Sequence, residues 1–127
     1  MKEFKPAGYS TVSPYLIVDG ARELIDLLKK LFGADEIRCF DRPDGSVMHA
    51  EVKIQDSVIM IADANDEFEA VPAILHVYVA DADATYEKAI SLGCTELEKP
   101  KSQADDPDRR GSFIDFAGNM WSVGTQL

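Results

Sequence analysis

The stretch Tyr15-Leu16-Ile17-Val18, followed by an apolar-striped run ending at Lys30-Leu31-Phe32-Gly33, decides the fold because the chain repeats it. A second strand-like stretch, His76-Val77-Tyr78-Val79, leads into a second such run that ends at Ser91-Leu92-Gly93. The two copies are offset by about 60 residues. Repetition at a fixed period indicates one supersecondary unit used twice. Because neither copy could bury its apolar face alone, we expect the two to pack together and to leave a ligand cleft between them.

Each copy has the pattern of a strand, a helix and further strands. Helices are expected over 20–32 and 83–92, because each run ends in a glycine suited to a helix C-terminus. Strands are expected over 11–18, 36–40, 47–54, 57–62, 74–79, 95–99, 112–115 and 120–125, with a polar loop over 100–110. The pattern predicts an α+β fold in one domain over 1–127. Its first module covers about 10–63, its connector 64–72 and its second module about 73–127.

The composition limits the classes of partner. The chain has 127 residues, enough for one core, and carries 23 acidic against 13 basic residues for a net charge of −10. This charge argues against nucleic acid and against an anionic membrane surface. It favours a cationic or neutral ligand, with a merely solubilising surface as the alternative. No run is long and apolar enough to span a membrane, and the start lacks the apolar core of a signal peptide, so we expect a cytoplasmic protein.

Two cysteines lie far apart and outside any paired-thiol motif. Cys39 and Cys94 both have apolar neighbours, so we expect each to behave as a small core residue. A disulfide or a reactive thiol is the alternative.

Strand alternation separates a helix-covered face from a ligand-facing one. In 47–54, we expect the apolar set Met48, Ala50, Val52 and Ile54 to lie under the helix. His49, Glu51 and Lys53 then lie on the other face. The same alternation assigns four further residues to the ligand-facing side: Tyr15, His76, Tyr78 and Ser122.

Two other patterns leave alternatives open. His49 and Glu51 lie on one strand face, and His76 could complete a set of three metal ligands, although polar residues on a strand are more often hydrogen-bonded lining. Arg109 and Arg110 close the polar loop just before a strand. Arginines in such a place can hold a carboxylate or phosphate in bidentate fashion. The alternative is a local salt bridge to Asp105, Asp106 or Asp108.

Five stretches carry a family resemblance: 14–18, 29–34, 45–51, 78–84 and 109–121. Over about residues 10–127 the chain resembles the vicinal oxygen chelate superfamily, which includes glyoxalase I, bleomycin resistance proteins and extradiol dioxygenases. Within it, the chain is most similar to the PhnB-like glyoxalase-like group. The resemblance implies two βαβββ modules, a curved eight-stranded mixed-sheet cleft and a homodimer.

The resemblance also bears on metal binding. The metal enzymes of the superfamily place one ligand on the first strand and one on the last strand of each module. The corresponding positions here are Ser13, Met60, Ile74 and Ser122. None is a good ligand for a divalent metal, so the expected site has neither metal nor cofactor.

The resulting functional hypothesis is a glyoxalase/bleomycin-resistance-like protein that binds a small organic molecule, favoured to be cationic, without the usual metal. The alternative is a lyase, isomerase or dioxygenase-type enzyme with an off-pattern site at His49, Glu51 and His76, where a histidine and a glutamate could transfer a proton. A dimeric structural protein is a third class and leaves the polar face unexplained. The candidate ligand-binding residues are Tyr15, His49, Glu51, Met60, His76, Tyr78, Arg109 and Ser122.

Overall fold

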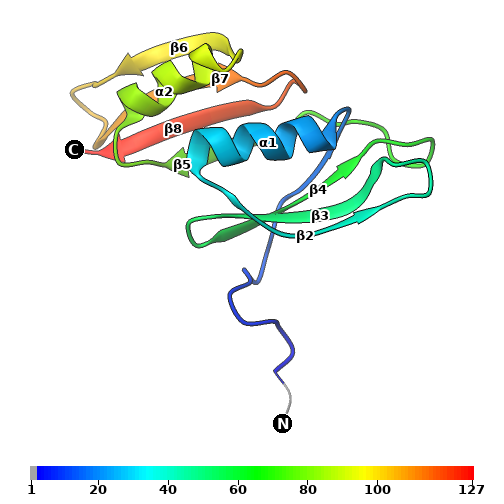
Figure 1. The fold of residues 1–127 in the computed structure, drawn as a ribbon. Coiled ribbons are helices and arrows are strands. Elements are labelled where there is room, and N and C mark those ends of the chain that lie inside the picture. The colour runs from blue at the N-terminus through cyan, green and yellow to red at the C-terminus, as the bar shows by residue number, and fades with distance from the viewer. Residues whose placement is uncertain (1–2) are drawn as a thin grey trace. The chain divides into compact units, whose positions relative to one another are not determined.

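The computed structural model describes residues 3–127, within which the chain forms two helices and eight strands (Figure 1). Met1 and Lys2, the first residues of the segment weighed above as a signal peptide, lie outside the described part. The elements follow the order β1 (Tyr15–Val18), α1 (Ala21–Phe32), β2 (Asp35–Asp41), β3 (Val47–Ile54), β4 (Ser57–Asp63), β5 (Ile74–Tyr78), α2 (Ala82–Ser91), β6 (Thr95–Lys101), β7 (Asp108–Ile114) and β8 (Met120–Gln126).

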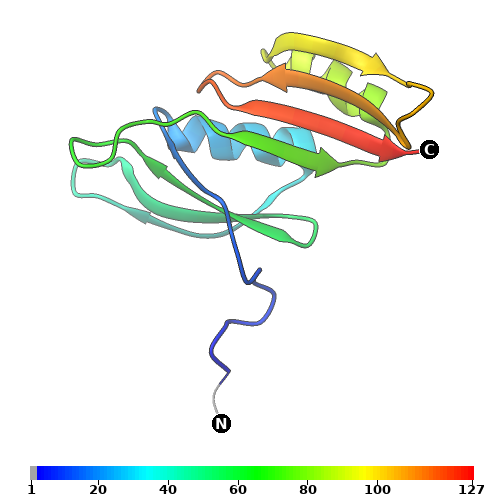
Figure 2. The ribbon, with the colours of Figure 1, turned by 180° about the vertical axis from the view of Figure 1, so that it is seen from behind.

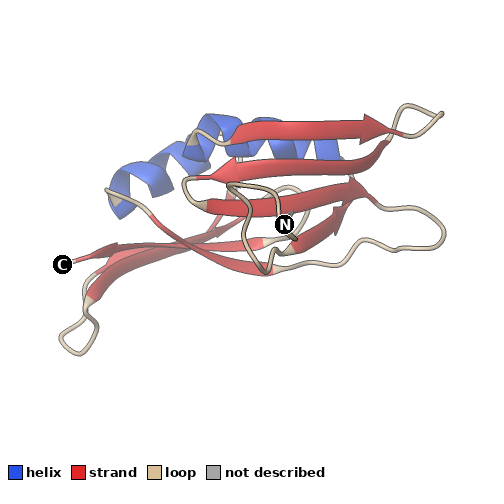
Figure 3. Ribbon diagram, turned by 90° about the horizontal axis from the view of Figure 1, so that it is seen from below, coloured by secondary structure: helices blue, strands red, loops and turns tan. Residues whose placement is uncertain are grey.

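The strands form two four-stranded mixed sheets, one in each compact unit of the chain. The first unit ends at Val71 and the second begins at Pro72, so the division falls in the expected connector. The strand orders are β1-β4-β3-β2 and β5-β8-β7-β6. In each sheet the first strand pairs in parallel with the last, and the other pairs are antiparallel. Both units are therefore βαβββ modules, as expected, and their strands are drawn in red in Figure 3.

The internal repeat extends to the register of the strands. Tyr15 on β1 pairs with Met60 on β4, which in turn pairs with Glu51 on β3. The same row in the second sheet joins His76, Ser122 and Ser112. Each residue of the second row lies 61 or 62 positions after its counterpart, so the two copies agree almost residue by residue.

Each helix covers one face of its own sheet. Helix α1 contacts β2, β3 and β4, and α2 contacts β6, β7 and β8; in Figure 2, α2 lies behind these three strands. Fully buried side chains fill the space between each helix and its sheet. In the first module they include Leu24, Leu28 and Val52, and in the second Phe113 and Trp121. The opposite face of each sheet, here called the helix-free face, carries the polar rows.

The ends of α1 follow from local chemistry. Gly33 adopts a left-handed conformation, with φ of 67°, and its N–H donates to the carbonyl of Lys29, which ends the helix as expected. At the other end Gly20 has no side chain to cap the helix. Asp63 at the end of β4 replaces it, because its Oδ1 accepts from the N–H groups of Gly20 at 3.1 Å and Ala21 at 2.8 Å.

The first sheet corrects two expectations. Strand β1 begins at Tyr15 and not at residue 11, because Pro14 has no N–H to extend the ladder. Met48 was expected under the helix, yet it is 50% exposed, whereas Val47 is fully buried. The pairing of β2 with β3 shifts between Phe40 and Asp41, which leaves Met48 as the extra residue of a β-bulge.

The second sheet corrects the expected polar loop over 100–110. Strand β6 continues through Pro100 to Lys101, and β7 already begins at Asp108. A proline is tolerated here because β6 is an edge strand and because Pro100 lies where its pairing with β7 shifts, between Glu98 and Lys101. Gly111 on β7 gives the proline ring room, since a β-carbon there would lie 2.8 Å from Pro100 Cγ.

The cysteines behave differently from each other. Both are free thiols. Cys94 is buried, as expected, and burial raises its pKa to about 11. The expectation of a core position was wrong for Cys39, which is half-buried on the edge strand β2.

Candidate functional site

A hydrogen-bonded chain of three side chains crosses the helix-free face of the first sheet. His49 on β3 lies between Tyr15 on β1 and Glu51, two residues further along β3. Its Nδ1 is 2.7 Å from the Tyr15 hydroxyl, and its Nε2 is 2.8 Å from Glu51 Oε2. The imidazole is therefore fixed at both nitrogens.

Glu51 is a buried acid, with only 5% of its surface exposed. The hydroxyl of Tyr9 donates to its Oε1 at 2.5 Å, and Nε of Arg38 lies 3.0 Å from the same oxygen. Burial raises the pKa of Glu51, but the hydrogen bonds from Tyr9 and His49 and the charge of Arg38 outweigh burial and leave this pKa below its ordinary value. Glu51 is thus held as a carboxylate at neutral pH.

Aromatic rings flank this polar chain. The ring of Phe40 on β2 stacks on the His49 ring at a centroid distance of 6.5 Å and an interplanar angle of 22°. The Tyr15 ring lies 5.5 Å from His49 on the other side. Tyr15 is 46% and Phe40 48% exposed. We call Tyr15, Phe40 and His49 the aromatic platform. Met60 pairs with both Tyr15 and Glu51 in the row beside it and is half-buried.

The second sheet places His76 and Ser122 side by side. His76 Nδ1 is 3.0 Å from Ser122 Oγ, and the His76 ring meets Tyr78 edge-on at 4.8 Å. Burial and the nearby charge of Arg110 lower the pKa of His76, with Asp108 acting in the opposite sense. His76 is thus held neutral at physiological pH.

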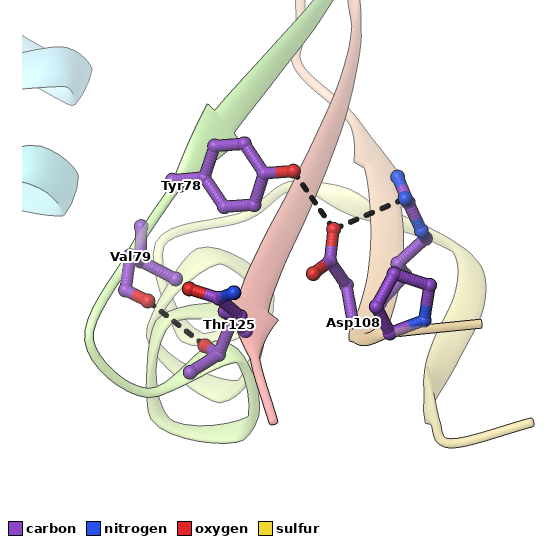
Figure 4. A pocket seen from close by; sticks show the side chains of 7 residues that line it. Tyr78, Val79, Asp108 and Thr125 are labelled. Carbon is purple, nitrogen blue, oxygen red and sulfur yellow. Dashed lines mark hydrogen bonds and ion pairs between the residues drawn. The ribbon is translucent and has the colours of Figure 1, made fainter.

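A second charged network lies beside Tyr78, in an open pocket of about 670 Å³ (Figure 4). Asp108 Oδ2 accepts from the Tyr78 hydroxyl at 2.8 Å and from Arg110 at 3.1 Å. Asp108 is 4% exposed, and its hydrogen bond with Tyr78 raises the pKa of that phenol. The pocket is lined by Tyr78, Val79, Pro107, Asp108, Arg110, Thr125 and Gln126. Arg110 and Ser122 also line a smaller pocket of about 200 Å³.

The two arginines of interest lie on β7 and not in a loop. Arg110 donates to Asp106 at 2.7 Å, so the local salt bridge foreseen for it is present. Arg109 makes a bidentate pair with Asp83 in the first turn of α2, at 2.6 and 3.0 Å. The guanidinium of Arg109 is therefore already occupied by a carboxylate of the protein itself.

Sequence reasoning missed several residues that complete these networks. Tyr9 precedes the first expected strand, which begins at residue 11, and Arg38 and Phe40 were not assigned to a face. The pairing register of β2 with β3 would have identified Arg38 and Phe40, since Arg38 pairs with Glu51 and Phe40 pairs with His49. Of the eight expected site residues, the structure brings together Tyr15, His49 and Glu51 beside Met60 in one module, and His76, Tyr78 and Ser122 in the other.

The four positions that the resemblance assigns to the metal ligands of the superfamily carry poor donors for a divalent metal. Met60 and Ser122 occupy equivalent rows of the two sheets, but one offers a thioether and the other a hydroxyl. Ile74 has no donor atom, and Ser13 precedes β1. Within residues 3–127, no group of three or more His, Cys, Asp or Glu side chains could hold a metal ion. His49 and Glu51 lie together, whereas His76 belongs to the other unit.

No helix in the described part of the chain is long and apolar enough to cross a membrane.

Comparison with known proteins gives relatives by sequence and by structure. Mb0911c of Mycobacterium bovis, an uncharacterized protein, is 31% identical over 124 residues, which cover 89% of this chain and 81% of the relative. Rv0887c of Mycobacterium tuberculosis has the same identity, with 72% of its length covered. The chain matches no protein-family model.

Solved structures share the fold at low sequence identity. TioX from Micromonospora sp. ML1 has a TM-score of 0.76 at 16% identity, covering 93% of this chain and 99% of TioX. A PhnB protein from Bacillus cereus has a TM-score of 0.73 at 19% identity, covering 91% and 99%. The fosfomycin resistance protein FosX from Listeria monocytogenes has a TM-score of 0.69 at 17% identity, covering 93% of each chain. The chain therefore belongs to the same family as Mb0911c and Rv0887c, and its paired βαβββ modules have the fold of TioX, the PhnB protein and FosX, the glyoxalase/bleomycin resistance fold.

Proposed function

We propose that this protein binds a small organic molecule on the helix-free face of its first sheet, without the metal of the superfamily's enzymes. One observation carries the proposal: His49 is fixed at both nitrogens, between the exposed Tyr15 and the buried Glu51. Ordering a polar chain on a sheet face costs side-chain entropy that simple solvation would not require. Such a cost is typical of a preorganised binding site.

The composition of the surface supports a small-molecule ligand. Binding sites combine apolar or aromatic lining with a few polar groups that fix orientation. The aromatic platform supplies the aromatic lining. The hydrogen-bonded chain of Tyr15, His49 and Glu51 supplies the polar groups, and the Tyr15 hydroxyl is its exposed end. The net charge of −10 attracts a cationic molecule at long range. FosX, which shares the fold, is described as a resistance protein for fosfomycin, itself a small molecule.

The donor chemistry supports binding without a metal. One structure of FosX is described as a complex with Mn(II). Here the four matching positions carry two hydroxyls, one thioether and one alkyl side chain: Ser13, Ser122, Met60 and Ile74. Divalent cations of this kind prefer imidazole and carboxylate ligands, so we expect ligand binding to be independent of metal.

A second candidate function is an enzyme that moves a proton without a metal. The observation that favours it is again the Tyr15–His49–Glu51 chain, whose distances of 2.7 and 2.8 Å are within the reach required for general acid–base catalysis. In this candidate His49 is the base and Glu51 orients it.

The test is a thermal-shift screen of chelator-treated protein against Zn, Ni, Mn, Fe(II) and a panel of neutral and cationic organic molecules. A ligand that binds only the folded state adds about 2.7 kcal/mol of stability at a hundredfold excess over its dissociation constant. We expect organic molecules to raise the melting temperature and the metals to have no effect. Stabilisation by metals alone would overturn the proposal. Light scattering on the same sample tests the expected homodimer.

The variant Tyr15→Phe should bind the organic ligand more weakly, and so show a smaller thermal shift, while it keeps the melting temperature of the free protein. The matched control is Tyr86→Phe, which removes a phenol hydroxyl from α2 of the other module. An undiminished thermal shift in Tyr15→Phe, or an equal decrease in both variants, would contradict the assignment of the site.

A further inference from the structure

The geometry points to a specific ligand chemistry at this site: a neutral, planar molecule that donates a hydrogen bond, through an O–H or N–H group, to the hydroxyl oxygen of Tyr15. The inference rests on the proposed function and deepens it, because it names the class of ligand.

The direction of the hydrogen-bonded chain begins at Glu51. Its two oxygens receive the hydroxyl of Tyr9, the guanidinium of Arg38 and one nitrogen of His49. A carboxylate that meets three donors acts only as an acceptor. The Nε2 atom of His49 must therefore carry a hydrogen and donate it to Glu51.

The direction then passes to Tyr15. In the neutral form of His49 that the inference requires, a ring with a hydrogen on Nε2 has none on Nδ1, so that Nδ1 is an acceptor. The hydroxyl of Tyr15, 2.7 Å away, must donate to it. Its only hydrogen is then used, and its oxygen offers lone pairs to the surroundings. Because Tyr15 is 46% exposed, a ligand on the platform can reach that oxygen and must itself be the donor.

The local charges favour a neutral ligand over a charged one. The charge of Glu51 is paired with Arg38 at 3.0 Å and is covered by its partners. Burial raises the pKa of the Tyr15 phenol; the charge of Arg42 lowers it, and the charge of Glu51 raises it by less than Arg42 lowers it, so the positive charge is the stronger of the two at this hydroxyl. A cation attracted at long range by the net charge of −10 would therefore meet a neighbouring positive group at the site.

The shape of the platform favours a planar ligand. The rings of Phe40 and His49 are only 22° from parallel, and Phe40 is 48% exposed. A flat ligand stacked on these rings buries apolar surface of its own and of the rings. Its donor group would then lie at the platform edge formed by Tyr15.

Three small probes separate the alternatives. 4-Methylphenol is planar and carries a donor, 4-methylanisole replaces the donor by a methyl ether, and benzyltrimethylammonium carries a charge but no donor. Dissociation constants are measured from the NMR chemical shifts of the His49 ring. We expect 4-methylphenol to bind roughly three- to tenfold more tightly than the ether, the range expected for one hydrogen bond. We expect the cation to bind no better than the ether.

Variants locate the effect. Tyr15→Phe should remove the preference for the phenol over the ether, and Tyr86→Phe should keep it. Equal binding of the phenol and the ether to the native protein would overturn the inference, as would tightest binding of the cation. If none of the three probes binds while other organic molecules still raise the melting temperature, this inference fails and the proposed function stands. If no organic molecule stabilises the protein, the proposed function fails as well.

Discussion

The imidazole of His76 lies over the backbone of Gly124, so closely that a β-carbon at Gly124 would be 3.0 Å from His76 Cε1 and 3.2 Å from Nε2. Gly124 is the partner of Tyr78 in the parallel pairing of β5 with β8. A glycine inside a strand often marks the close approach of another group. Here the group is a histidine that also bonds Ser122, so the absence of a side chain at residue 124 helps to position a candidate ligand-binding residue.

Gly124→Ala should displace the His76 ring while the protein remains folded. The contact is with the movable end of a side chain and not with backbone, so a shift of a few tenths of an ångström relieves it. We expect a stability change below about 1 kcal/mol and a clear change in the NMR resonances of the His76 ring. Unchanged His76 resonances would contradict the proposed contact. Gly118→Ala is an unsuitable control because Gly118 has a φ of 89°.

Glu51→Ala should destabilise the first module. The substitution leaves the donors of Tyr9, His49 and Arg38 without their common acceptor, at a cost of about 1–3 kcal/mol for a buried unpaired group. Denaturant unfolding measures the loss. Glu98→Ala is the matched control, since Glu98 is exposed and forms an ion pair with Lys101, three residues away; it should change stability by less than about 0.5 kcal/mol. Equal effects of the two substitutions would show that the Glu51 network does not stabilise the fold.

His76 should make stability depend on pH. Its pKa in the folded protein is lowered from the ordinary value of 6.5, so the unfolded chain binds a proton at this residue first. The contribution is fully present above pH 6.5 and is lost as the pH falls through the lowered folded value. The facing charges are Arg110, which lowers this pKa, and Asp108, which raises it.

The measurement is the denaturation midpoint as a function of pH, for the native protein and for His76→Gln. The native protein should lose more stability than the variant as the pH falls below 6.5. Identical slopes in the two proteins would mean that His76 has the same pKa in the folded and unfolded chains.

The sequence was sufficient to predict the modules, because their pattern is local. The apolar stripe of α1, the glycine that ends it and the repeated strand all depend on near neighbours. The errors occurred where the fold depended on partners. The exposure of Met48 follows from a bulge in the pairing with β2, and Pro100 is tolerated in β6 because that strand is at the sheet edge and its pairing with β7 shifts there. Neither condition can be read from one strand alone.

The candidate site was predictable only in part, for the same reason. Alternation along β3 placed His49 and Glu51 on one face, and Tyr15 was assigned to the equivalent face of β1. Two of the three residues that lower the pKa of Glu51 are separated from it in sequence: Tyr9 by 42 residues, and Arg38 on the neighbouring strand. Arg109 shows the converse, because its partner Asp83 comes from α2 and not from the nearby aspartates. To predict which residues of different elements interact, one must know the register of the strands and the position of the helix on the sheet.

Asp63 is the last residue of β4, and Thr125, 62 residues later, is the penultimate residue of β8. Each accepts from the first helical N–H group of its module, but their removal is expected to have unequal costs. Asp63 accepts from three backbone N–H groups, those of Gly20, Ala21 and Val47. Thr125 accepts from only one, that of Ala82. Helix α2 also has its own cap, Asp81, whereas α1 has none.

Asp63→Ala should therefore cost about 1–3 kcal/mol, because it leaves several N–H groups without an acceptor. Thr125→Val, which keeps the shape of the side chain, should cost about 1 kcal/mol. Asp66→Ala, at an exposed acid of the connector, is the control and should change stability by less than about 0.5 kcal/mol. Urea unfolding of the three variants measures these differences. An equal loss of unfolding free energy in Thr125→Val and Asp63→Ala would contradict the prediction that the cost depends on how many N–H groups each side chain binds.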